Sequence, residues 1–140
     1  MQINLRRATC SWIVLMNWVK KYLQIQYKEM NCSRFVEYVL RDHFKIDYTF
    51  PQSQGSLFNQ SQQIRQSIPQ FAAKVEKGET GDLVLMHGRR RMCHVGLLVV
   101  HNGVEYVLHT EMSMKTAALH RFRDLIVYGY KVEGVYSWLK

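Results

Sequence analysis

A cysteine and two histidines are spaced so that they could act together as a nucleophile and its base. Cys32 falls at the predicted start of a helix, where unpaired backbone N–H groups and the helix dipole are expected to lower the pKa of its thiol. His94 opens a predicted core strand and is the candidate base. His109 ends the neighbouring predicted strand and is the candidate group that orients the imidazole of His94. The pattern predicts a Cys–His–His triad.

Two other interpretations of these residue types are weaker. Cys93 directly precedes His94, and adjacent strand residues point to opposite faces, so the two are not expected to share one site. A packed, idle thiol is the expected state of Cys93 and the alternative for Cys32, because free cysteines are usually buried. Metal binding is disfavoured because the spacing of its candidate ligands gives no closed four-ligand pattern. Those candidates are His87, Cys93, His94 and His101.

Four segments resemble the motifs of one peptidase family, in the order in which that family carries them. NCSRFVEYVL from Asn31 resembles D-C-S-G-F-V, and GDLVLM from Gly81 resembles G-D-L-V-F-F. CHVGLLVV from Cys93 resembles S-H-V-G-I, and VLHT from Val107 matches the segment with the third site residue. The chain is therefore similar to NlpC/P60 cysteine peptidases. The resemblance implies a papain-like α+β fold, cleavage of amide bonds in bacterial peptidoglycan peptides, and no metal or organic cofactor.

The resemblance assigns a role to each matched position. It implies that Cys32 is the nucleophile, His94 the base and His109 the orienting residue. Tyr27 matches a tyrosine that shapes the oxyanion site in this family, although the usual Gly-Gly between that tyrosine and the cysteine is missing. Ser33 and Arg34 follow the nucleophile and are candidate oxyanion or substrate-binding residues. Arg34 replaces the family's glycine, where it could narrow the cleft or bind an acidic group of the substrate.

The segments MNCSRFVEYVLRDHFKID and VEGVYSWL further resemble phage and prophage members of that family, which accompany tail genes. This implies peptidoglycan peptides as substrate and phage tail proteins as partners, with a role in tail assembly or in opening the cell wall. One alternative is a non-catalytic tail component with the same fold. The other is a basic nucleic-acid-binding module, although no aromatic RNA-binding signature, zinc knuckle or convincing helix-turn-helix is visible.

The residues that could do chemistry must be positioned by helices in the first half and strands in the second. Periodicity predicts three helices, over 9–24, from Cys32 or Ser33 to about Ile46, and over 61–75 with an interruption at Pro69. The stretch 48–63 reads as a loop, and strands are predicted from Asp82, His94, Val104 and Ile126. HNG at 101–103 predicts a tight hairpin turn. This order predicts an α+β domain with an antiparallel sheet, and the length of 140 residues predicts a single domain over 1–140.

Composition limits the environment and the partners. The net charge of +8 favours polyanionic partners, and Arg89–Arg91 form a basic loop that is either a solvated turn or a contact for anionic wall glycans. Three cysteines without a pairing pattern suggest reduced thiols in a protein made in the cytosol. The N-terminal segment lacks a small-residue cleavage site, so we expect no signal peptide and delivery to a virion tail or the cell wall by another route.

Overall fold

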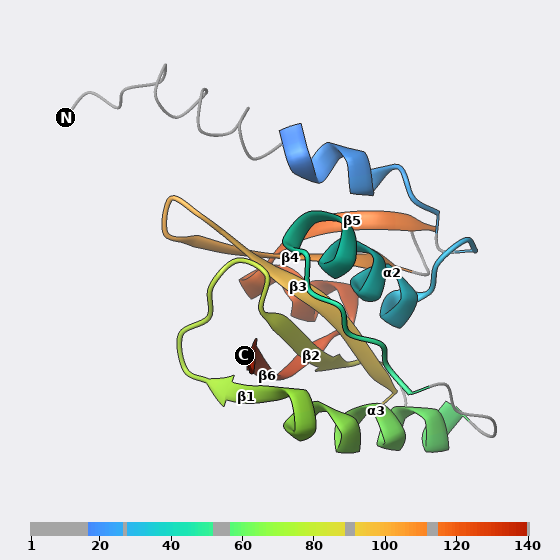
Figure 1. Cartoon of the computed structure of the whole chain (residues 1–140). Coiled ribbons are helices and arrows are strands. Elements are labelled where there is room, and N and C mark those ends of the chain that lie inside the picture. The colour runs from blue at the N-terminus through green and yellow to red at the C-terminus, as the bar shows by residue number, and fades with distance from the viewer. Residues whose placement is uncertain (1–16, 27, 52–56, 89–91, 112–114, 140) are drawn as a thin grey trace, which may run out of the picture.

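The computed structural model describes residues 17–26, 28–51, 57–88, 92–111 and 115–139 (Figure 1). Residues 17–23 are helical and fall within the first predicted helix, whose other residues lie largely outside the described part. The remaining helical elements are α2 (Cys32–Val39), the π-helical turn η1 (Leu40–Phe44), α3 (Leu57–Phe71) and the 3-10 helix η3 (Phe122–Tyr128). The strands are β1 (Ala72–Val75), β2 (Leu83–His87), β3 (Cys93–His101), β4 (Val104–Glu111), β5 (Thr116–Arg121) and β6 (Lys131–Trp138).

The six strands form one sheet in the order β1-β6-β2-β3-β4-β5, and the strand pairings are all antiparallel. The predicted α+β architecture with an antiparallel sheet is thereby confirmed. The predicted hairpin is confirmed as well: β3 ends at His101, β4 begins at Val104, and Asn102 and Gly103 have φ angles of 51° and 75°. This hairpin places the two predicted site histidines on neighbouring strands.

Helix α2 begins at Cys32, as the sequence predicts, because Asn31 caps it. The Oδ1 atom of Asn31 accepts the backbone N–H of Arg34 at 3.1 Å, which satisfies one of the donors left open at a helix N-terminus. The apolar face of α2 carries Phe35, Val36 and Val39, all of which are fully buried. The helix continues into the wider π-helical turn η1, after which Lys45 adopts a left-handed conformation with φ of 58°.

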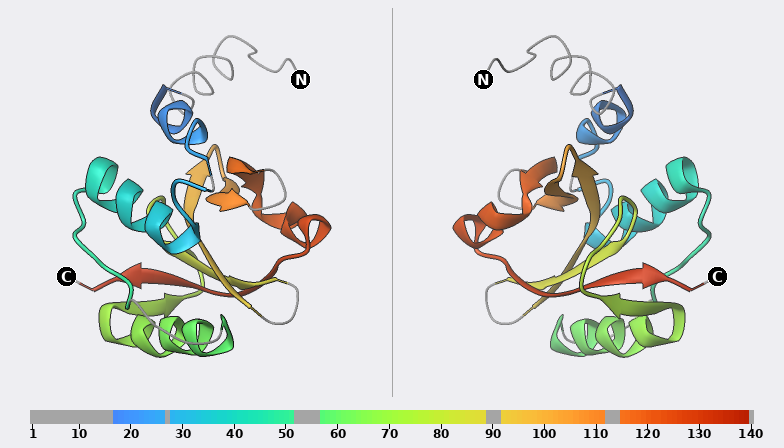
Figure 2. Two further views of the ribbon diagram at one scale, coloured as in Figure 1. Left: turned by 90° about the vertical axis from the view of Figure 1, so that its right-hand side faces the viewer. Right: turned by 90° about the vertical axis from the view of Figure 1, so that its left-hand side faces the viewer.

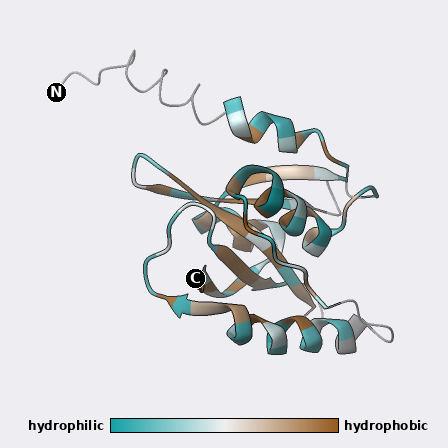
Figure 3. Cartoon of the chain, in the orientation of Figure 1, coloured by the Kyte–Doolittle hydropathy of each residue, from teal (hydrophilic) through white to brown (hydrophobic). Residues whose placement is uncertain are grey.

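Two apolar clusters lie on the two faces of the sheet. The larger joins α2 and the helical segment 17–23 to the side of β3 that carries Val95, Leu97 and Val99. The smaller lies on the other face, where Leu98 packs near Leu125 of η3. Figure 2 shows α2 and η3 on opposite sides of the sheet, and Figure 3 shows the hydrophobic strands between them. The alternation of side chains along β3 therefore decides which residues face the helix that carries Cys32.

Three expected boundaries differ from the observed structure, and one strand was not predicted. Helix α3 already begins at Leu57, inside the predicted loop 48–63, and it runs through Pro69 to end at Phe71. The predicted helix over 61–75 is wrong at its end, because Ala72–Val75 pair with β6 as strand β1. The strand predicted from Ile126 begins only at Lys131, since residues before it form η3. Strand β5, which pairs with β4, was not predicted.

Within the residues that the structure describes, none of the helices has the length and apolar character that crossing a membrane requires.

Candidate active site

The first residue of α2 is Cys32, and its surroundings differ from the expectation of an easily ionised thiol. Burial raises the pKa of the Cys32 thiol, and this effect outweighs the hydrogen bonds from the backbone of Val95, Ser33 and Cys32 itself, which lower it. The expectation of a lowered pKa is therefore wrong in its net direction. The helix N-terminus does favour the thiolate, but the apolar packing around the sulfur costs more.

The backbone contact with Val95 places the thiol against β3, one residue along the chain from His94. The pairing of β3 with β4 runs from Leu97–Leu108 to His101–Val104, so Val95 lies beyond the last paired residues. Val95 belongs to the face of the sheet that α2 covers. The nucleophile candidate thus lies where β3 and β4 stop pairing.

His94 and His109 are brought into direct contact. The Nε2 atom of His94 lies 2.8 Å from Nδ1 of His109, and both side chains are buried. The ring of His94 stacks on Tyr130, with centroids 4.4 Å apart and an interplanar angle of 18°. Stacking and hydrogen bonding together fix the orientation of the His94 imidazole, which a base requires.

A third histidine, which was not among the predicted site residues, continues this contact. Nε2 of His109 lies 3.0 Å from Nδ1 of His120 on β5, and His120 stacks on Tyr128 at 3.8 Å. In the register of β4 and β5, His120 stands opposite Val107, two positions from His109, so the two histidines are diagonal neighbours on one face. Only the unexpected strand β5 could have revealed this pairing.

His109 stands between two other imidazoles and is electrically neutral. Burial, followed by the neighbouring His94 and His120, holds the pKa of His109 well below its ordinary value. Each of its ring nitrogens faces a ring nitrogen of a neighbour. No group of three or more His, Cys, Asp or Glu side chains among the described residues is arranged to hold a metal ion.

Cys93 occupies the side of β3 that faces α2, whereas His94 stacks with Tyr130 on the other side. This divergence agrees with the expected alternation. The backbone N–H of Cys93 donates to Oγ of Ser61 at 2.9 Å, and burial, with the nearby Cys32 as a smaller cause, raises the pKa of the Cys93 thiol to about 12. Cys93 therefore shares a side of the strand with Cys32, but it stays a thiol.

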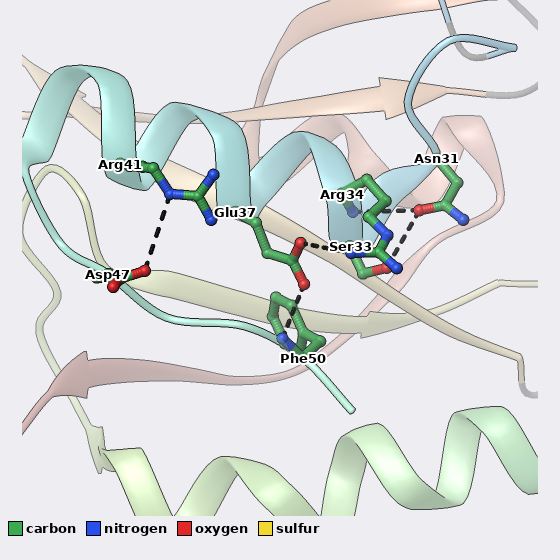
Figure 4. A network of polar contacts seen from close by, with 7 residues as sticks. All are labelled: Asn31, Ser33, Arg34, Glu37, Arg41, Asp47 and Phe50. Carbon is green, nitrogen blue, oxygen red and sulfur yellow. Dashed lines mark hydrogen bonds and ion pairs between the residues drawn. The ribbon is translucent and has the colours of Figure 1, made fainter. Parts of the chain in front are cut away.

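A pocket of about 220 Å³ lies beside the start of α2, and two of the predicted binding residues line it, Ser33 and Arg34. The hydroxyl of Ser33 donates to Oδ1 of Asn31 at 3.1 Å (Figure 4). Arg34 is partly exposed and contacts the buried carboxylate of Glu37 at 3.2 Å. The other oxygen of Glu37 accepts the backbone N–H of Phe50 at 2.8 Å, which fixes the wall of the pocket.

The predicted site residues thus fall into two groups. His94 and His109 touch, while Cys32 contacts Val95, the residue after His94, and Ser33 and Arg34 line the adjacent pocket. Tyr27 and the basic loop Arg89–Arg91 lie outside the described residues. Comparison of the chain with protein-family models, with curated proteins and with solved structures finds no match.

Proposed function

We propose that the chain is a cysteine peptidase or amidase of the NlpC/P60 kind, with a papain-like fold formed by residues 1–140 as one domain. The observation that carries the proposal is the 2.8 Å contact between the rings of His94 and His109. Val95, the residue after His94 on β3, contacts Cys32 through its backbone. The four family-like motifs supply the substrate class, the amide bonds of peptidoglycan stem peptides. They also supply the setting, a phage or prophage tail.

Because the pKa of Cys32 is raised, its thiol needs a base to remove the proton during the reaction. His94 takes the thiol proton as the sulfur attacks the amide carbonyl, rather than meeting a thiolate that already exists. His94 then protonates the leaving amine. It next removes a proton from water, which hydrolyses the thioester and regenerates the thiol.

The pocket beside α2 would hold the substrate. Ser33 and Arg34 line it next to the nucleophile, and a guanidinium is suited to a carboxylate of the stem peptide because it offers several donors in one plane. The carboxylate of Glu37 forms an ion pair with the guanidinium of Arg34 and partly balances its charge. Replacing Arg34 would therefore weaken substrate binding more than it would slow the chemical step.

The test is digestion of purified muropeptides by the whole protein, followed by mass spectrometry of the products. We expect fragments that differ from the substrates by cleavage of one amide bond with addition of water. The Cys32→Ala variant is the matched control and should yield none, while Cys93→Ala should cleave normally. Products at equal rates from wild type and folded Cys32→Ala would overturn the proposal.

The net charge of +8 favours a second candidate, a basic module that binds nucleic acid or another polyanion without cleaving anything. A non-catalytic tail component is the corresponding alternative within the same fold. These two candidates predict that folded Cys32→Ala and His94→Ala variants keep the binding or assembly function of the wild type. A peptidase would instead lose its cleavage activity in both variants.

A further inference from the structure

The pairing of β2 with β3 fixes the direction of each backbone amide at the start of β3. The N–H of Gly88 donates to the carbonyl oxygen of Met92 at 2.9 Å, and the N–H of Leu98 donates to that of Asp82 at 2.8 Å. The amides of an antiparallel strand point alternately to its two sides, so the even-numbered residues of β3 bond to β2. The amides of the odd-numbered residues point away from β2.

Two of these amides, those of Cys93 and Val95, come before Leu97, the first residue of β3 that β4 pairs. The backbone of Val95 bonds to the sulfur of Cys32. The N–H of Cys93 donates to Oγ of Ser61 on α3 at 2.9 Å, and Ser61 is buried. A buried N–H without a partner is costly, so Ser61 supplies the acceptor that the sheet does not provide.

Other contacts hold the helix that carries Ser61 against the sheet. One turn further along α3, the guanidinium of Arg65 contacts both carboxylate oxygens of Glu133 on β6, at 3.1 and 3.2 Å. At its end α3 runs directly into β1, which pairs with β6. The same helix lines the candidate substrate pocket with Gln60 and Ile64. The Ser61 hydroxyl is therefore a fixed point to which the first residue of β3 is bonded.

We propose that Ser61 is a positioning residue for the base: by accepting the N–H of Cys93, it fixes the backbone from which the next residue, His94, extends. The inference rests on the proposed function for its catalytic meaning, while the placement of the His94 ring is a property of the folded protein. Ser61 acts through the backbone of Cys93, and the Cys93 thiol has no part in it. Such placement matters because a displacement of about 1 Å at a reacting group can cost about a hundredfold in rate.

Nuclear magnetic resonance of the whole protein tests this placement without any substrate. The ring protons of His94 should carry a ring-current shift from Tyr130, whose ring is stacked 4.4 Å away. In Ser61→Ala these signals should move toward the values of an unstacked histidine. Hydrogen exchange of the Cys93 amide should become about tenfold faster or more, because the amide loses its acceptor. Ser61→Thr keeps the hydroxyl and should restore both measurements.

Ser67→Ala is the matched control, because Ser67 is also a buried serine of α3 but its hydroxyl donates to the carbonyl oxygen of Ile64 at 2.8 Å. It should leave the His94 signals and the exchange of the Cys93 amide unchanged. A Cys93 amide that exchanges in the wild type as fast as an exposed amide would overturn the proposal without any variant. Unmoved His94 signals in folded Ser61→Ala would overturn it as well.

Activity on muropeptides provides the second readout. The kcat of Ser61→Ala should fall about tenfold with little change in KM, because a misplaced base slows proton transfer while the pocket keeps its residues. Ser61→Thr and Cys93→Ala should keep most of the kcat, since the first retains the hydroxyl and the second the backbone N–H. A raised KM with unchanged kcat in Ser61→Ala would assign Ser61 to the pocket and overturn the proposal. A wild type without peptidase activity whose His94 signals move in Ser61→Ala would refute the proposed function and leave the placement of His94 by Ser61 standing. An active wild type whose His94 signals do not move in that variant would refute the inference alone.

Discussion

Cys32 and Cys93 lie close together on one side of β3, yet their environments differ. Burial raises the pKa of both thiols, but Cys32 also receives backbone hydrogen bonds from β3 and from the start of α2. Such bonds stabilise the thiolate and oppose the effect of burial at Cys32. The causes of the raised pKa of Cys93 include no such bonds, and the sequence motif also points to Cys32 as the nucleophile.

This difference predicts which thiol reacts. Limited treatment with iodoacetamide, followed by peptide mapping, should label Cys32 well ahead of Cys93, whose pKa is raised to about 12. The labelling rate of Cys32 should rise about tenfold between pH 7.5 and 8.5, because the thiolate fraction grows tenfold per pH unit below the pKa. Preferential labelling of Cys93 in the folded protein would contradict the assignment of the nucleophile.

Replacement of His94 is predicted to reduce the peptidase activity more than replacement of His109. His94→Ala removes the group that transfers the proton, so activity should fall by roughly two to four powers of ten, close to the Cys32→Ala background. His109→Asn keeps an amide oxygen near Nδ1 that can accept the Nε2–H of His94, so measurable activity should persist. Steady-state kinetics on one muropeptide, with circular dichroism to verify folding, compares them. Near-normal cleavage by folded His94→Ala would show that the chemistry lies elsewhere.

At the scale of elements, local patterns predicted some features well. The start of α2 followed from the apolar spacing after Cys32, and the 101–103 turn followed from Asn-Gly. The predictions that were wrong concern elements whose structure depends on partners far along the chain. Ala72–Val75 have no strong strand character of their own, but their pairing with β6 makes them a strand.

The residues of the candidate site divide in the same way, between those with a local signal and those placed by distant pairing. Cys32, His94 and His109 stand out through residue type and position, whereas His120 belongs to TAALHR, which has little strand signal. Its place beside His109 is a product of the β4–β5 register. The stacking of Tyr130 on His94 was not predictable either, because a strand was predicted where η3 and the turn at Gly129 bring Tyr130 back to the sheet.

Close approach of β3 and β4 gives a prediction for Gly96. A Cβ atom at this position would lie 2.6 Å from Val107 Cγ1 and 3.0 Å from both His109 Cβ and Leu108 O. Gly96→Ala should therefore lower the free energy of unfolding by about 1–3 kcal/mol and displace His109 from His94. Urea denaturation and the muropeptide assay measure the two effects. Gly88→Ala, where the nearest atom is at an ordinary 3.4 Å, is the control and should change both measurements little.

At the scale of the whole molecule, a buried neutral histidine couples stability to pH. The pKa of His109 is lowered in the folded protein, so the unfolded chain binds a proton more readily once the pH falls below the ordinary histidine value of about 6.5. The contribution of neutral His109 to the free energy of unfolding should thus be fully present above that pH. Below it, the free energy of unfolding should decline by up to about 1.4 kcal/mol per pH unit for this group. Urea midpoints from pH 7.5 to 5 should show a shallower decline for His109→Asn, and equal declines would contradict the buried neutral state.

The surplus of positive charge predicts attraction to wall polymers that weakens with salt. Exposed charges are screened beyond about 8 Å at physiological ionic strength, so co-sedimentation with purified sacculi should decrease as sodium chloride is raised. Cys32→Ala should bind sacculi as the wild type does, because it leaves the net charge of +8 unchanged. Salt-sensitive binding to DNA or RNA in the absence of binding to sacculi would favour the nucleic-acid candidate instead.

The position of β6 has a consequence for how the chain acquires its structure during synthesis. β6 is the last strand of the described chain, yet it lies inside the sheet, between β1 and β2. Until residues 131–138 leave the ribosome, β1 has no partner and one edge of β2 is open. A nascent chain at that stage exposes apolar strand edges that invite association with other chains. Completion of the sheet must therefore be a late, long-range event that follows translation of nearly all the described residues.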